Sequence, residues 1–214
     1  MSVLDDLDWA AVREMYDSRK GVHRLLGSLV KKDDSKAFVR LALGIDDEAG
    51  NYSASDHGLG KRILGSNGAD PWSRIRDLAN ELAALDDGRL VPDVIRRAGI
   101  RYLGVSVGSE MGCLVNPVAC WVTNTRTVWA HLLVKHGDDI QKANRELALY
   151  RESDADSAMD YQLWAGLHPE LNVSLTRIAE MGGRLARKEG VKAGAETYLW
   201  ADAIANELYA HLHV

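Results

Sequence analysis

The segment from Val105 to His131 holds the residues of this chain best suited to chemistry, and it reads VSVGSEMGCLVNPVACWVTNTRTVWAH. Glu110 and His131 would form an acid and base pair, because a carboxylate beside an imidazole favours its charged form and poises it for proton transfer near neutral pH. Cys113 would be a nucleophile if its thiolate were stabilised. We therefore name Glu110, His131 and Cys113 as the candidate catalytic residues.

Small polar groups are predicted to share one face of a helix over residues 120–136. Helical spacing places four of them in a single stripe, namely Cys120, Asn124, Thr127 and His131. A polar stripe beside an apolar face must meet water or find partners, so it can line a binding site. With their neighbours, among them Arg126 for an anionic group, the candidate ligand-binding residues are Asn116, Trp121, Asn124, Arg126 and Thr127.

The glycine-rich stretch around Glu110 is expected to be a turn. Gly108 and Gly112 flank it, and the preceding run IRYLGVSV at residues 100–107 is β-branched and aromatic, which indicates a strand-like segment. A strand needs a partner, so we expect a small hairpin or an extended segment there. Binding residues often lie on turns held by rigid elements, which places the expected pocket between the 105–116 turn and the 120–136 helix.

The same polar stripe also has a purely structural interpretation. Asn124 and Thr127 would satisfy buried backbone groups, and His131 would be a hydrogen-bonded core histidine. The discriminating feature is depth, because a concave and partly apolar pocket around Glu110 and His131 favours function, whereas a filled core favours structure. The sequence leaves both interpretations open.

Several familiar site patterns are missing from the sequence. Gly58, Gly60 and Gly65 do not complete a dinucleotide fingerprint, because Ile63 stands where its third glycine would be. The chain contains no ExxH pair, no GxSxG elbow and no phosphate loop, and the spacing of its two cysteines does not fit a zinc knuckle. No metal site is predicted, and the cofactor stays unassigned.

Composition narrows the class of partner. The net charge of −5 gives no basic field for a phosphate backbone, so nucleic acid is not an expected partner. No run approaches the roughly 18 apolar residues of a membrane span, and the acidic opening MSVLDDLDWAAV is unlike a signal peptide. We expect a cytoplasmic protein with no membrane partner, in which Cys113 and Cys120 are reduced and unbridged.

Apolar residues recur at helical spacing through most of the chain. The pattern predicts a helix over residues 71–88 that is capped by Asp70, and further helices almost throughout the C-terminal half, with a break at His168-Pro169. Residues 46–70 are interrupted by Gly, Ser, Asn and Asp, and they are expected to form the longest loop.

The expected fold is mainly α, a multi-helix orthogonal or bundle-like single domain over residues 1–214 with at most a small β element near residues 100–107. A small N-terminal lobe over residues 1–70 is the alternative division. The first functional hypothesis is small-molecule binding at the expected pocket, with acid and base catalysis on a small polar or anionic ligand. The second is an interaction protein of immunity or adaptor type, whose acidic helical surface binds a partner protein. The third is a homo-oligomer, a homodimer that uses Trp-rich helix faces.

Overall fold

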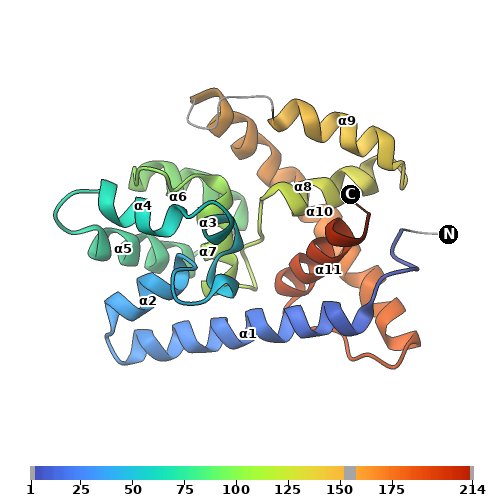
Figure 1. Cartoon of the computed structure of the whole chain (residues 1–214), viewed down its shortest axis with the longest axis horizontal. Helices are drawn as coiled ribbons and strands as arrows, with labels where there is room; N and C mark the ends of the chain where they lie inside the picture. Colours follow the sequence, from blue (N-terminus) through green and yellow to red (C-terminus); the bar gives the residue numbers. More distant parts are fainter. Residues whose placement is uncertain (1–2, 152–157, 213–214) are drawn as a thin grey trace. The chain divides into compact units, whose positions relative to one another are not determined.

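The computed structural model describes residues 3–151 and 158–212. Helices hold 74% of these described residues, and no strand occurs among them (Figure 1). The mainly α fold predicted from the sequence is therefore confirmed. The strand-like run at residues 100–107 is a turn followed by the start of a helix, so the hairpin or extended segment expected there was wrong.

Contacts divide the chain into two compact units. Unit 1 comprises Met1–Asp17 and Thr123–Val214, and unit 2 comprises Ser18–Val122. The first helix, α1 (Trp9–Lys31), contributes residues to both. The single domain over residues 1–214 and the alternative lobe over residues 1–70 both stay predictions. The boundaries of the two units do not coincide with residue 70.

Unit 2 continues from α1 through a series of short helices. They are α2 (Ser35–Ala42), the 3-10 helix η1 (Glu48–Gly50), α3 (Tyr52–Asp56), α4 (Leu59–Ser66), α5 (Pro71–Ala83), the 3-10 helix η2 (Gly88–Leu90), α6 (Val91–Ala98) and α7 (Val105–Val115). Helix α5 begins as predicted, because the Asp70 side chain accepts a hydrogen bond from the Ser73 N–H ahead of a proline.

The loop expected over residues 46–70 was wrong, because η1, α3 and α4 lie within it. Asp47 caps η1 by accepting a hydrogen bond from the Ala49 N–H, and Asn51 caps α3 by accepting one from the Ala54 N–H. The polar residues that interrupt the apolar period are thus the caps of very short helices.

Unit 1 is completed by four helices, α8 (Thr125–Lys135), α9 (Ile140–Arg151), α10 (Ala158–Lys188) and α11 (Thr197–Leu212). The break expected at His168-Pro169 was wrong, because α10 continues through Pro169. A proline inside a helix removes one backbone hydrogen bond and crowds the preceding turn. Burial of Leu167, Leu171 and Leu175 along one face continues across the proline and offsets that cost.

Large aromatic side chains fill the core of unit 1. The ring centroids of Trp9 and Trp200 lie 6.3 Å apart, and Tyr16 meets Trp200 edge-on at 5.6 Å. The Tyr16 hydroxyl accepts a hydrogen bond from the Ala195 N–H at 2.9 Å, so its polar edge is satisfied. Trp9, Trp129 and Trp200 are fully buried, so these indoles do not form the exposed face invoked for a homodimer, which stays a prediction.

Cys113 and Cys120 form no disulfide, as predicted, and both are buried. Burial raises the pKa of the Cys120 thiol to about 12. Across the described ranges, no helix combines the length and the apolar character that crossing a membrane requires.

Gly50 tests the close packing of η1 against α2. A Cβ at this position would lie 1.8 Å from the carbonyl oxygen of Leu41, a backbone atom that cannot turn away. We expect Gly50→Ala to lower the free energy of unfolding by at least about 1–3 kcal/mol, because the added methyl group overpacks this contact. Urea denaturation measures the change. Gly65→Ala is the control, because open space surrounds this glycine of α4 and alanine favours a helix there. Equal stability of the two variants would show that η1 is not held against α2.

Candidate functional site

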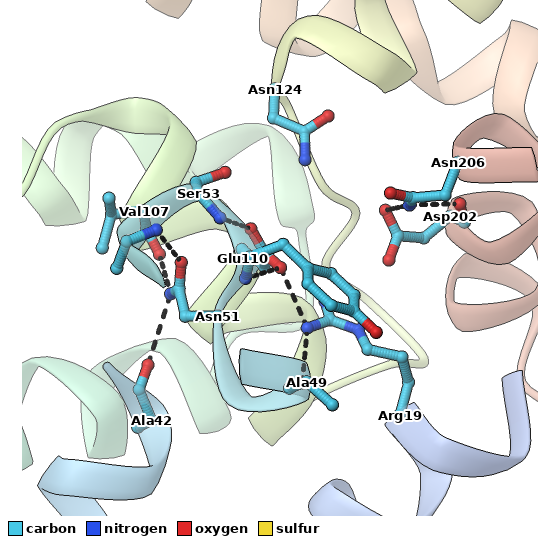
Figure 2. Close-up of polar contacts among 12 residues, drawn as sticks. Arg19, Ala42, Ala49, Asn51, Ser53, Val107, Glu110, Asn124, Asp202 and Asn206 are labelled. Atoms are coloured by element: carbon cyan, nitrogen blue, oxygen red, sulfur yellow. Dashed lines mark hydrogen bonds and ion pairs between the residues drawn. The ribbon is translucent and has the colours of Figure 1, made fainter. Parts of the chain in front are cut away.

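Glu110 lies on α7 with no exposed surface, so the expected turn over residues 105–116 was wrong. Its carboxylate forms an ion pair with Arg19, at 2.9 Å from the guanidinium nitrogen Nη1 to Oε1. The backbone N–H groups of Tyr52 and Ser53 donate to its two oxygens at 2.8 and 3.0 Å (Figure 2). Both carboxylate oxygens of Glu110 are therefore engaged within unit 2.

The GSEMG sequence is helical because its glycines permit close packing. A Cβ on Gly108 would lie 2.4 Å from a methyl group of Ile95 on α6. A glycine inside a helix often allows a neighbouring element to pack closely against it. In a sequence alone, glycine is more often taken to indicate a turn. The close contact between α6 and α7 therefore requires a glycine at position 108.

Asn51 completes the polar framework beside Glu110. Its side-chain nitrogen donates to the carbonyl oxygens of Val107 at 2.9 Å and Ala42 at 3.3 Å (Figure 2). Arg19 donates in turn to the carbonyl oxygen of Ala49 at 2.8 Å. The three side chains together tie α1, α2, η1, α3 and α7 to one another, which is a structural role.

Arg19 was missed by the sequence analysis, although a signal for it exists. The buried residues Trp9, Val12, Tyr16, Val22 and Leu26 mark the apolar stripe of α1. Arg19 falls on that stripe, and its side chain has no exposed surface. A charged residue on a buried stripe requires an opposite charge or hydrogen bonds, so the spacing alone points to a buried partner.

Two of the remaining candidates in unit 2, Cys113 and Trp121, are also buried, and the third, Asn116, is half-buried. Cys113 has no exposed surface. Asn116 is the C-cap of α7, and its side-chain nitrogen donates to the carbonyl oxygen of Leu85 at 2.8 Å. Trp121 packs closely against Gly88, where a Cβ would lie 2.5 Å from the indole ring. These contacts give Asn116 and Trp121 packing roles, and their ligand-binding role stays a prediction.

The polar stripe is not continuous, because the helix expected over residues 120–136 begins only at Thr125. Cys120 and Asn124 precede that helix. Asn124 is its N-cap, with Oδ1 accepting from the backbone N–H groups of Arg126 and Thr127 at 3.0 and 3.1 Å. The Thr127 hydroxyl accepts in return from the Asn124 N–H at 3.0 Å, which completes a capping box.

His131 lies on α8 in unit 1 and is 7% exposed. Its Nδ1 is 2.9 Å from the hydroxyl oxygen of Ser174 on α10. Its Nε2 is buried and has no hydrogen-bond partner among the described residues. Burial lowers the pKa of His131, although the charge of Glu170 acts in the opposite direction. Glu110 and His131 thus belong to different units with partners of their own, and their pairing stays a prediction.

A second polar cluster in unit 1 joins α8 to α11. The Arg126 guanidinium donates from Nη1 to Oδ1 of Asn206 at 2.8 Å. Asn206 donates from Nδ2 to the carbonyl oxygen of Asp202 at 2.7 Å and to its carboxylate at 3.2 Å (Figure 2). Asp202 and Asn206 are buried. The sequence analysis did not select them, although two polar residues one turn apart in an apolar helix are a detectable signal.

Asn124 borders this cluster and holds an unused donor. Its Oδ1 is occupied by the helix cap, which identifies the other side-chain atom as the nitrogen Nδ2. That nitrogen makes no hydrogen bond with any described residue, although the side chain is only 6% exposed. Figure 2 shows the Asn124 nitrogen pointing away from the first turn of α8.

Comparisons with protein-family models, with curated proteins and with solved structures found no match. Within residues 3–151 and 158–212, no group of three or more His, Cys, Asp or Glu side chains is arranged to hold a metal ion.

The buried ion pair of unit 2 gives a stability prediction. Glu110→Gln removes the negative charge that pairs with Arg19. It also replaces one of the two carboxylate oxygens, which accept hydrogen bonds from backbone N–H groups, with an NH₂ donor. We expect a loss of about 3–5 kcal/mol in the free energy of unfolding, the usual cost of breaking a buried pair. The control is Asp93→Asn in the exposed pair with Arg96, which should cost less than about 1 kcal/mol. Similar urea midpoints for both variants would rule out this structural role of Glu110.

His131 gives a pH prediction. In the folded state the imidazole of His131 stays neutral, because burial lowers its pKa. In the unfolded chain the same imidazole takes up a proton below about pH 6.5. The unfolded state then binds more protons, so the free energy of unfolding should fall as pH drops below that value. His131→Gln should flatten this slope between about pH 5 and 7 in urea titrations. His57→Gln at an exposed position is the control, and an equal flattening there would contradict the assignment.

Proposed function

We propose that this chain binds a small polar ligand at a cluster in unit 1, which we call the α8–α11 cluster and define as Asn124, Arg126, Asp202 and Asn206. The single observation that carries the proposal is the Asn124 Nδ2 donor, which makes no hydrogen bond with the described residues although Asn124 is only 6% exposed. A donor in a largely buried residue costs free energy when it lacks an acceptor, so an acceptor from a ligand would stabilise it.

The charges of the α8–α11 cluster define what the ligand must offer. Asn124 and Arg126 are donors, so the ligand needs an acceptor or a negative group on that side. Asp202 supplies a buried carboxylate, which suits a donor on the other side of the same molecule. The hydrogen bonds from Arg126 to Asn206 and from Asn206 to Asp202 hold these groups in place before a ligand arrives.

The other candidates take supporting roles in this proposal. Thr127 positions Asn124 through the capping box. Glu110 holds the backbone of unit 2, and His131 packs against Ser174. The two buried and unbridged thiols support a reducing compartment, and the cytoplasm remains the setting that we propose.

Asn124→Asp tests the donor without removing the helix cap. Aspartate caps a helix about as well as asparagine, so Oδ1 keeps its two backbone contacts while the N–H donor becomes an acceptor. We expect native mass spectrometry of protein purified from cells to show a small-molecule adduct on the wild type. Asn124→Asp should lower the fraction of protein carrying that adduct about tenfold, the effect of losing one hydrogen bond in a buried site.

The matched control is Asp70→Asn, the reverse exchange at the N-cap of α5. It should keep both the adduct and the thermal midpoint of the wild type. Absence of any adduct on the wild type, or an equal adduct on all three proteins, would contradict the proposal. Circular dichroism melting of Asn124→Asp verifies that the cap is intact.

A further inference from the structure

A pocket lies within unit 1, between the end of α8, the middle of α10 and α11. Its floor is apolar, with Leu133, Ile178 and Leu208 among the buried side chains that line it. Arg177 and Gly137 also line it and are exposed, so the pocket opens to solvent on their side. It shares no residue with the α8–α11 cluster, so ligand binding at one site can be disproved without affecting the proposal for the other.

The size of the pocket limits its occupant. Its cavity volume is about 140 Å³. An apolar cavity of roughly 150 Å³ holds a molecule the size of benzene, so this floor accepts an apolar group of about six heavy atoms or fewer. A branched aliphatic side chain fits that limit.

Two opposite charges line the same pocket. Arg177 on α10 forms no ion pair or hydrogen bond with any residue of the described ranges, and it lines the cavity with Asp138. Asp138 accepts one long hydrogen bond, from the Val3 N–H at 3.4 Å, and likewise forms no ion pair within those ranges. A cation and a carboxylate are therefore both available beside an apolar floor.

The backbone holds Asp138 in a defined place. Its φ is 68°, in the left-handed region that only glycine, asparagine and aspartate adopt readily. The preceding Gly137 is left-handed as well, and the Asp138 N–H donates to the carbonyl oxygen of Leu133 at 2.9 Å. The turn that ends α8 thus fixes the aspartate at the pocket.

We infer that this pocket binds a free apolar α-amino acid whose side chain has about six heavy atoms or fewer, such as leucine. The side chain occupies the apolar floor, the α-carboxylate binds Arg177 and the α-ammonium binds Asp138. An apolar carboxylate without an amino group would pair with Arg177 but offer no cation to Asp138. An apolar amine would pair with Asp138 but offer no anion to Arg177. A zwitterion satisfies both groups.

Isothermal titration calorimetry of the full chain tests the inference with L-leucine, isocaproate and isoamylamine. The last two are leucine without its amino group and leucine without its carboxylate. We expect L-leucine to bind about tenfold more tightly than either analogue, because each analogue loses one charge-assisted contact. Absence of leucine binding, or equal or tighter binding of either analogue, would overturn the inference.

Two variants assign the contacts. Arg177→Gln should weaken L-leucine binding about tenfold and leave isoamylamine unchanged, and Asp138→Asn should weaken L-leucine similarly and leave isocaproate no weaker. Asparagine also tolerates the left-handed backbone, and Arg177 is exposed, so both variants should fold. Arg184→Gln is the matched control on α10, because Arg184 is exposed and is not among the residues lining the pocket. A loss of leucine affinity in Arg184→Gln equal to that in Arg177→Gln would overturn the assignment.

Discussion

The ion pair between Arg19 and Glu110 is the interaction on which the arrangement of unit 2 depends. Removing two charges from water is expensive, and their attraction offsets that cost only when further hydrogen bonds satisfy the remaining polar atoms. Here backbone groups of residues 49–53 supply three such bonds, as two donors to Glu110 and one acceptor for the Nη1 atom of Arg19. The pair therefore selects one path for the short helical turns of residues 48–56, which have few apolar residues of their own.

Unit 1 uses its buried polar groups differently. Around Glu110 both carboxylate oxygens have partners, which is the pattern of a group kept for structure. Asn124 and His131 each use one side-chain atom in a structural contact and have a nitrogen that makes no hydrogen bond with any described residue. A half-used polar side chain is well positioned yet still able to bind, which is why a ligand is proposed in unit 1.

The sequence predicted helices wherever an apolar period was long, and it failed where one residue type serves two purposes. Asn51 caps a helix of five residues, which is too short to show a period. Gly108 allows close helix packing, although glycine more often marks a turn. For the candidate site, the sequence selected Asn124 and Arg126, and their ligand-binding role stays a prediction. It could not pair Arg19 with Glu110, because their contact depends on the path of 90 intervening residues.

The cysteines have a consequence for how opening of this protein can be observed. The sequence has two, and both lie in unit 2. A thiol reacts as its thiolate, so Cys120, with a pKa raised to about 12 and no exposed surface, is protected until its surroundings open. The rate of alkylation by a thiol reagent would thus report local unfolding of unit 2. Local unfolding confined to unit 1 would leave that rate unchanged.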